Sequence, residues 1–420
     1  MYSRRSTTKR KSTIHQDSIS TKKKKNSLSG LTLKPIYQQT LGSGSVFTGG
    51  SNNEGQLGIT ERQLCKIPTL VENLTDIVDI CAGAMHTLCI DKNGKVHSWG
   101  CNDELALGRE TTSETEAIPG EVNLDEKVVQ ITAGDSHSAA LTETGKVYAW
   151  GSFRDSHGEM GLTPEGKPKM PTLIMNNAAK IASGANHLLI LSTEGLLYSL
   201  GCAEQGQLGR ISVRFADRGS RCGLGNFLNP RIIHALRKKK FDEIWVGSYN
   251  SFAREHSTSH IYSFGLNNYY QSGLEEEKIY PWPVVSKPFS TNKKWVSICG
   301  GDHHTLSLDN TGTTYVLGKK EYGRLGLGEY CDDVQEPTVI PGLKNEEITS
   351  ISCGSCVSFA LTREGEAYGW GMGTTYQLGK GSKKDNHEPK LVSGEQMQDY
   401  KIIKVCSGAQ HTVFLAQRKT

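Results

Sequence analysis

Short apolar runs rich in Val, Ile, Tyr and Trp alternate with glycine-containing turns along most of the chain. One motif has a glycine, two residues, an aromatic residue, two residues and a glycine, and it begins at residues 44, 94, 145, 195, 259, 312 and 365. His97 stands at the aromatic position of the second copy, and Ser259 replaces the first glycine of the fifth. Turns such as TETG (142–145) and DNTG (309–312) lead into the motif. The pattern predicts β-hairpins.

Two further motifs accompany this run. An apolar segment, in most copies containing Gly-x-x-His, covers residues 80–90, 131–141, 181–191, 297–308, 351–361 and 405–415, with a degenerate copy at 244–253. A turn close to Asn-x-x-Gly-Gln-Leu-Gly lies at 52–58, 102–108, 203–209, 320–326 and 374–379. Together the motifs define seven units of about 51 residues, which we place at about 42–92, 93–143, 144–193, 194–257, 258–310, 311–363 and 364–416.

Seven four-stranded units predict an all-β fold, a seven-bladed β-propeller over residues 34–418. A helical solenoid is the alternative, but no copy shows a 3.6-residue period over ten residues. The run at 44–50 lacks a hairpin partner next to it, and the one unpaired partner segment is at 411–415. We therefore expect both chain ends to complete one blade, which closes the ring without a free sheet edge.

The composition is rich in glycine and predicts a soluble protein. The 420 residues include 46 glycines and 36% hydrophobic residues, and no apolar run approaches the length of a membrane span. We expect no membrane association and no secretory signal, because the N-terminus has no apolar segment. The 11 cysteines are odd in number and irregularly spaced, which favours reduced thiols over a disulfide framework.

Charge is concentrated at the N-terminus. The first 30 residues hold nine Lys and Arg residues against one acid, Asp17. Residues 1–33 have few large apolar side chains, so we expect a disordered tail. The tail contains two basic clusters ten residues apart: Lys9, Arg10, Lys11, and Lys22, Lys23, Lys24, Lys25. This spacing is typical of a bipartite nuclear import signal, and such clusters also bind DNA phosphates; a merely solubilising tail is the alternative.

Five histidines recur at one position of the repeat: His86, His137, His187, His304 and His411. A residue used in most units is usually structural, so we interpret them as bonding a turn rather than as metal ligands. The two residues before each histidine vary and follow a glycine at a strand end. We expect them to line one rim of a central channel and to suit a partner surface.

Motifs for catalysis and cofactors are missing. There is no P-loop, no Gly-x-Ser-x-Gly turn and no His-Glu-x-x-His pair, so the sequence predicts neither a cofactor nor a catalytic residue. Cys353 and Cys356 form a single Cys-x-x-Cys, which without a second pair does not predict a zinc site. A propeller enzyme with a His/Asp site at the channel mouth stays an alternative.

Several segments resemble the regulator of chromosome condensation family: GCNDELALGRE (100–110), TAGDSHSAALTETGKVYAWGSFRD (132–155), GGDHHT (300–305), EYGRLGLGE (321–329) and WGMGTTYQLG (370–379). The resemblance covers roughly residues 34–418. It implies a guanine nucleotide exchange factor without covalent chemistry, which acts on the small GTPase Ran at chromatin. Such a factor supports nucleocytoplasmic transport, spindle assembly and nuclear envelope formation. A chromatin-bound scaffold without exchange activity is the alternative.

The resemblance also implies site residues. GTPase contacts and exchange fall on His86, Asp135, Arg210, His303 and His411. Two positions that are acidic in the family fall on Asn53 and Asn186, and a family glutamate falls on Glu165 or its neighbour Pro164. The family's β-wedge, which presses on the phosphate-binding region of the GTPase, falls on Phe153, Arg154, Asp155, Ser156, His157, Gly158, Glu159 and Met160.

Chromatin contacts fall on an insertion in the fourth unit. By resemblance, Arg218 and Arg221 enter the acidic patch of the nucleosome's histone dimer, and Arg237, Lys238, Lys239 and Lys240 lie against DNA. The alternative for the lysine run is a solvated loop. We expect chromatin on one face of the ring and the nucleotide-free GTPase on the other. The other expectations are an import receptor as partner, a monomer, a nuclear location and association with chromosomes in mitosis.

Overall fold

The computed structural model describes residues 31–35, 42–216 and 223–419. Most of the predicted basic tail therefore lies outside the described residues. All elements below belong to the unit formed by residues 32–420. None of the helices in the described ranges is long and apolar enough to cross a membrane.

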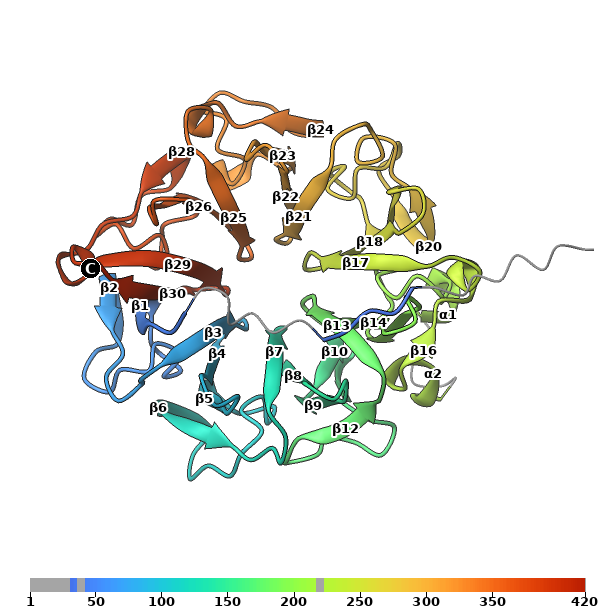
Figure 1. The fold of residues 1–420 in the computed structure, drawn as a ribbon, viewed down its shortest axis with the longest axis horizontal. Coiled ribbons are helices and arrows are strands. Elements are labelled where there is room, and N and C mark those ends of the chain that lie inside the picture. The colour runs from blue at the N-terminus through green and yellow to red at the C-terminus, as the bar shows by residue number, and fades with distance from the viewer. Residues whose placement is uncertain (1–30, 36–41, 217–222, 420) are drawn as a thin grey trace, which may run out of the picture. The chain divides into compact units, whose positions relative to one another are not determined.

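Seven four-stranded antiparallel sheets stand around a central channel, as Figure 1 shows. The fold is the predicted seven-bladed β-propeller. Going outward from the channel, the first three blades are β3 (Ile77–Ala82), β4 (His86–Asp91), β5 (Val96–Cys101), β6 (Thr115–Val122); β7 (Val128–Ala133), β8 (His137–Thr142), β9 (Val147–Gly151), β12 (Thr172–Met175); and β13 (Ala178–Ser183), β14 (His187–Ser192), β15 (Leu197–Gly201), β16 (Arg231–Ile232).

Three more blades follow along the chain. They are β17 (Phe241–Val246), β18 (Asn250–Glu255), β19 (Ile261–Leu266), β20 (Ile279–Val285); β21 (Trp295–Gly300), β22 (His304–Asp309), β23 (Thr314–Gly318), β24 (Val334–Val339); and β25 (Ile348–Cys353), β26 (Val357–Thr362), β27 (Ala367–Gly371), β28 (Asn386–Leu391). Each sequence unit begins on a third strand, so it spans the outer half of one blade and the inner half of the next.

Both chain ends build the last blade, as the unpaired motif at 411–415 predicted. Its strand order from the channel outward is β29 (Tyr400–Ser407), β30 (His411–Arg418), β1 (Ser45–Ser51), β2 (Leu64–Leu70). Phe47 of β1 lies opposite Phe414 of β30 in the antiparallel pairing. Around the whole ring, the four strands of every blade are paired within one sheet.

Short helical segments lie between strands. They are α1 (Val213–Ala216), α2 (Gly225–Leu228), η3 (His234–Leu236), η4 (Glu321–Gly323), η5 (Pro341–Leu343) and η6 (Glu395–Met397). The remaining pair of strands, β10 (Phe153–Asp155) and β11 (Gly158–Gly161), forms a separate hairpin between β9 and β12. These are insertions into a regular β repeat.

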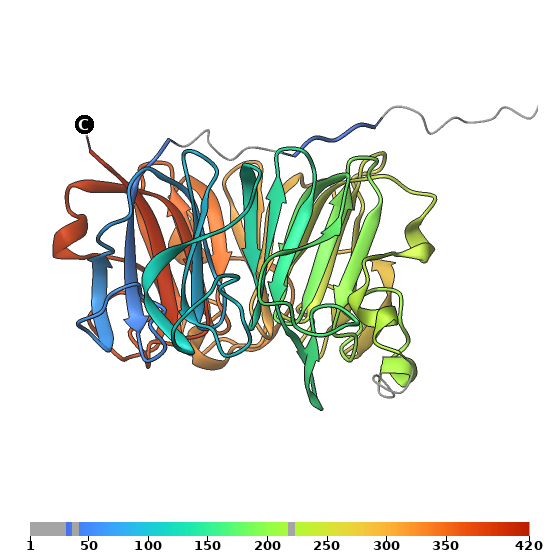
Figure 2. The same ribbon diagram turned by 90° about the horizontal axis from the view of Figure 1, so that it is seen from below.

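Strand order gives the ring two distinct faces. In an antiparallel blade, the turn after the first strand and the connection after the third strand lie at the same end. This end forms the face from which the β10–β11 hairpin projects in Figure 2, and we call it the hairpin face. The turns after second strands and the connections from one blade to the next lie on the opposite face.

Repeated histidines join neighbouring blades. Nε2 of His86, at the start of β4, lies 2.8 Å from Oγ of Ser138 in the next blade. The Ser138 hydroxyl donates to the carbonyl oxygen of Ala106 at 2.9 Å, so it accepts from the His86 ring. Trp150 Nε1 donates to the same carbonyl at 2.7 Å. A buried chain of three hydrogen bonds thus connects the two blades.

The same joint recurs elsewhere. His304, Ser358, the carbonyl of Arg324 and Trp370 repeat it, and so do His411, Thr87, the carbonyl of Gln56 and Trp99. His137 bonds Ser183 at 3.1 Å instead, because Leu188 stands where the neighbouring blade would offer a hydroxyl. The five histidines are thus structural, but each bonds a hydroxyl group of the neighbouring blade instead of the predicted turn.

A glycine stands three residues before these histidines because there is no room for a side chain between the blades at that position. A Cβ atom on Gly134 would lie 2.2 Å from Cε1 of His137 and 2.4 Å from the carbonyl oxygen of Gly184 in the next blade. Real Cβ atoms do not approach other heavy atoms so closely, so a side chain here would push the blades apart. This accounts for the Gly-x-x-His motif.

Burial lowers the pKa values of His86, His137, His187 and His411. Burial lowers the pKa of His187 to about 3, whereas the unfolded side chain has a pKa of 6.5. Below pH 6.5 the unfolded chain binds a proton that the folded chain excludes, so the contribution of His187 to stability is full above pH 6.5 and is lost as the pH falls toward 3.

Replacing His187 with Gln keeps a hydrogen-bond donor for Ser251 but removes the titration. Between pH 6 and pH 4, we expect His187→Gln to lose less stability per pH unit than the wild type, by about 1.4 kcal/mol per unit. Urea unfolding at several pH values measures this difference. Equal slopes in both proteins would contradict a neutral, buried His187.

Candidate functional site

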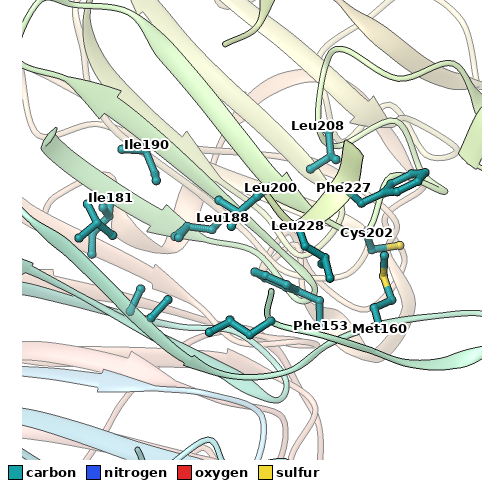
Figure 3. Close-up of a cluster of buried hydrophobic side chains, with 14 of the residues drawn as sticks. Phe153, Met160, Ile181, Leu188, Ile190, Leu200, Cys202, Leu208, Phe227 and Leu228 are labelled. Carbon is teal, nitrogen blue, oxygen red and sulfur yellow. The ribbon is translucent and has the colours of Figure 1, made fainter. Parts of the chain in front are cut away.

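The β10–β11 hairpin has a buried base and an exposed tip. Phe153 and Met160 belong to the buried apolar cluster drawn in Figure 3, which also includes Phe227 and Leu228. Phe153 also packs on the His137 ring, with centroids 4.4 Å apart. The segment predicted as a wedge is a hairpin whose two end residues, Phe153 and Met160, are buried, and its role as a wedge stays a prediction. The surface that can touch a partner is Arg154–Glu159.

Ion pairs brace this tip against neighbouring loops. Glu104 accepts from Arg154 and from Lys167, both at 2.7 Å, and Lys167 also lies 3.2 Å from Glu159. The side chain of Glu104 is only 11% exposed, which reduces the screening of these pairs by water. The brace is expected to hold the hairpin in one orientation.

Glu204 holds the hairpin from the other side. Its carboxylate accepts from the Ser156 backbone amide at 3.0 Å and from the Ser156 hydroxyl. Asp155, His157 and Glu204 bring potential ligand atoms within 4.8 Å of one another. Asp155 accepts from the His157 backbone amide at 2.8 Å, so these carboxylates are already engaged in shaping the turn. We interpret the group as a brace, and the absence of a metal site stays a prediction.

Asn186 connects the hairpin to the channel rim. Its side-chain oxygen accepts from the Arg154 backbone amide at 2.9 Å, and its side-chain nitrogen donates to Asp135 Oδ2 at 3.0 Å. The combination needs an amide, because an ionised carboxylate at 186 could accept from Arg154 but would have no hydrogen to donate to Asp135. The change from the acid expected by resemblance therefore builds a bridge that an acid could not make.

Asp135 is an unusual carboxylate. Burial and then the nearby charge of Asp302 raise its pKa to about 6, although the hydrogen bond from Asn186 acts in the opposite direction. Its backbone amide donates to the Ala185 carbonyl of the next blade at 2.8 Å. The backbone thus fixes the turn without help from the carboxylate. An acid held in this way is available to pair with a cation from a partner.

Across the rim, His303 lies among aromatic rings. Its ring centroid is 5.2 Å from that of Tyr269 and 6.5 Å from that of Tyr249. Burial, followed by the opposing effect of Asp302, leaves the pKa of His303 lowered. His303 is partly exposed on the hairpin face, as the rim prediction requires. Asn53 and Glu165 are exposed as well.

Three residues assigned by resemblance do not lie free at this rim. His86 and His411 are buried in the blade joints, and burial lowers their pKa values to about 4 and about 3. Neither ring is exposed on the rim, so their assigned contact with a GTPase stays a prediction. Arg210 bonds Ser199 of its own blade at 3.0 and 3.1 Å and the Asn226 carbonyl at 2.8 Å. It acts as a scaffold for the insertion.

Sequence reasoning missed Glu104, Lys167 and Glu204, which hold the hairpin. Glu104 and Glu204 belong to the turn motif after third strands, where the sequence offers charged residues in several units. The structural role of Arg210 could have been predicted from Arg109, which stands at the same repeat position. Arg109 bonds Ser98 as Arg210 bonds Ser199.

Known proteins share this architecture. A family model described as the RCC1-like domain matches residues 45–414. The chain belongs to this family. The human regulator of chromosome condensation is 45% identical over 388 residues, which cover 90% of this chain and 91% of that protein. The guanine nucleotide exchange factor SRM1 of Saccharomyces cerevisiae is 32% identical, over 82% of this chain and 80% of its own length.

A solved structure agrees with the fold. The crystal structure of Prp20p from Saccharomyces cerevisiae, described together with its binding properties to Gsp1p and histones, superposes with a TM-score of 0.80. It is 29% identical and covers 93% of this chain and 94% of its own. RCC1-like propellers therefore include proteins with named exchange and histone-binding properties.

In this RCC1-like propeller, the long insertion joins β15 to β16. Arg218 and Arg221 lie outside the described residues. The connection that contains them leaves a third strand, so its described ends are on the hairpin face, with α1 and α2 near the outer edge in Figure 2. The described ends of the insertion thus share a face with the hairpin, and binding of chromatin and the GTPase on opposite faces stays a prediction.

The second basic segment does lie on the opposite face, between β16 and β17. Lys239 pairs with Glu255 at 2.9 Å and lies over the Tyr262 ring, and Lys240 donates to the Glu194 carbonyl at 2.6 Å. Arg237 and Lys238 are exposed. Of the four residues predicted to contact DNA, these two are the more exposed, and Lys239 and Lys240 are partly buried.

This division predicts different effects of substitution. We expect Arg237→Ala with Lys238→Ala to lower DNA affinity and to reduce its dependence on salt, with an unchanged Tm. Lys239→Ala is the matched control and should lower Tm, because it leaves the buried Glu255 carboxylate without its cation. Binding to a labelled duplex at several salt concentrations measures the first effect. An unchanged salt dependence would contradict DNA contact by this segment.

Proposed function

We propose that this protein is a guanine nucleotide exchange factor for a GTPase of the Ran type and that it acts at chromatin. The observation that carries the proposal is the braced hairpin tip, Arg154–Glu159, which projects beside the rim acid Asp135. The identity to named exchange factors and regulators of chromosome condensation supports it. A scaffold without exchange activity gives no role to a hairpin held by three ion pairs.

Exchange of this kind needs no covalent step. The factor binds the nucleotide-free GTPase more tightly than the nucleotide-bound form, and by reciprocity it lowers nucleotide affinity by the same factor. A 10⁵-fold decrease requires about 7 kcal/mol of differential binding. In this proposal the hairpin provides the differential binding energy by occupying the space that the phosphate contacts of the GTPase need. The ion pairs at its tip keep the hairpin in position.

Asp135 favours the nucleotide-free state electrostatically. A basic side chain of the GTPase that loses its phosphate partner can pair with the Asp135 carboxylate. The Asn186 side chain links this acid to the hairpin: its oxygen lies 2.9 Å from the Arg154 backbone nitrogen, and its nitrogen lies 3.0 Å from Asp135 Oδ2. Hairpin entry and cation capture thus occur together.

Release of labelled GDP from Ran, with and without this protein, tests the proposal. We expect Asp135→Asn to slow release about tenfold or more, equivalent to at least about 1.4 kcal/mol. Tm should stay equal or rise, because a raised carboxyl pKa means that the folded state disfavours the charge. Wild-type release should fall below pH 6 as Asp135 is protonated, and the variant should show a flatter profile.

The control is Glu336→Gln, an exposed acid on the outer strand β24 and outside the Asn186 bridge. If Asp135→Asn released GDP at the wild-type rate while both variants were folded, the rim assignment would be wrong. No stimulation of release by the wild-type protein would instead remove the exchange function.

Chromatin binding is proposed for the insertion and for the basic segment on the opposite face. Arg218 and Arg221 would enter the acidic patch of the histone dimer, since guanidinium groups pair well with clustered carboxylates. Arg237 and Lys238 would lie against DNA phosphates. The basic clusters of the tail would bind an import receptor and DNA. Through these partners the protein would enter the nucleus and associate with mitotic chromosomes. It would act as a monomer.

The insertion can be tested apart from exchange. Arg218→Ala with Arg221→Ala should weaken binding to reconstituted nucleosomes about tenfold or more and leave GDP release from free Ran within about twofold of the wild type. Lys239→Ala serves as a control for a general loss of folding. Unchanged nucleosome affinity in the double variant would contradict an arginine-dependent docking site.

A further inference from the structure

The central channel holds two cysteine thiols that the proposed exchange does not use. The inner strands of the blades line this channel, whose volume is about 280 Å³. Cys299 lies on β21 and Cys353 on β25, which belong to neighbouring blades. Both side chains are partly exposed and line the channel. Both residues thus border the channel, although their thiol groups are largely covered by neighbouring atoms.

The two sulfurs are in direct contact. Their Sγ atoms are 3.3 Å apart, and Cys353 Sγ also lies 3.6 Å from the carbonyl oxygen of Cys299. A disulfide needs a separation of about 2.05 Å, so the sulfurs have to approach by little more than one ångström. Flexible χ1 angles of two channel-facing side chains can supply a shift of this size.

The surroundings favour a thiolate on one of the pair. Burial by itself raises the pKa of a thiol, but the hydrogen bond from Cys299 and the neighbouring His304 outweigh it at Cys353, and the pKa of Cys353 is lowered. Burial and the same contact raise the pKa of Cys299. The lower pKa makes Cys353 the thiol expected to attack an oxidant and leaves Cys299 as the thiol expected to resolve the product.

Two other cysteines provide an internal comparison. Cys81 on β3 and Cys406 on β29 line the same channel and are also partly exposed. Cys406 instead donates to the carbonyl oxygen of Ile80 at 3.2 Å. Burial raises the pKa values of both thiols. Position in the channel alone therefore does not create the features of the Cys299–Cys353 pair.

We propose that Cys299 and Cys353 form an oxidation site that hydrogen peroxide converts to a disulfide between two blades. The Cys353 thiolate attacks peroxide, an oxygen–oxygen bond breaks, and the products are a sulfenic acid and hydroxide. The Cys299 thiol then attacks the sulfenic sulfur, a sulfur–sulfur bond forms, and one water leaves. Two thiols are oxidised, one peroxide is reduced, and a thiol reductant reverses the change.

The disulfide would close a loop of 54 residues between neighbouring blades. It would lie beside the joint in which the Asp302 backbone amide donates to the Ser355 carbonyl at 3.0 Å. The cross-link therefore ties two inner strands at the point where the hairpin-face rim passes from one blade to the next.

The experiment treats the full-length wild-type protein with hydrogen peroxide, traps remaining thiols with an alkylating reagent and digests it with trypsin without reduction. The expected product joins the peptide of residues 295–319 to that of residues 345–363, with a mass lower by two hydrogens. Cys356 shares the second peptide, so fragmentation must place the bond on Cys353. We expect the pair to be lost about tenfold faster than the thiols of Cys81 and Cys406.

Matched variants define the outcome. Cys299→Ser and Cys353→Ser should each abolish the cross-link, and Cys81→Ser and Cys406→Ser should leave it unchanged. Dithiothreitol should restore both thiols. The proposal is overturned if the wild-type protein gives no linked peptide, if the bond is on Cys356, or if sulfinic acid forms in place of a disulfide. The wild-type mapping decides the question even if a variant does not fold.

Discussion

The ring depends on one repeated interaction, a backbone carbonyl oxygen that accepts two hydrogen bonds from the next blade. At Ala106 the donors are the Ser138 hydroxyl and the Trp150 indole, and the hydroxyl in turn accepts from His86. All of these side chains are buried. Losing one donor would leave a desolvated polar group without a partner, which costs more than a surface hydrogen bond contributes. Blade contacts are therefore specific as well as apolar.

This repeated joint leaves other positions free to differ between blades. The joint uses the histidine, the hydroxyl and the carbonyl, but not the two residues before the histidine or the outer part of the third-strand connections. The functional candidates occupy these freer positions. Asp135 and Asn186 lie in such turns, and the hairpin replaces an ordinary connection. The scaffold therefore supports a local site without changing its own contacts.

The sequence predicted what repetition can reveal. Glycine spacing and hairpin turns indicated seven blades, the closing blade and the structural role of the histidines. Repetition also bears on two assignments made by resemblance. His86 and His411 share the position of the structural histidines, so their burial followed from the pattern. The described ends of the insertion share the face of the hairpin, because both belong to connections after a third strand.

Contacts between side chains from distant segments could not be predicted from the sequence. The bridge from Asp135 through Asn186 to Arg154 joins residues from three separate segments, and no spacing rule relates them. The brace around Glu104 and the contact between Cys299 and Cys353 likewise depend on which side chains meet between blades. The sequence displayed these residues, but their pairing is a property of the ring.

The shared last blade has a consequence for synthesis on the ribosome. Strand β1 pairs with β30, and roughly 360 residues separate them. At about 5 to 20 residues per second, β1 and β2 wait about 20 to 70 seconds for that partner. During this time β1 presents an unpaired edge, which is a hazard for aggregation. Nascent chains of this protein are thus candidates for chaperone capture until the last strand emerges.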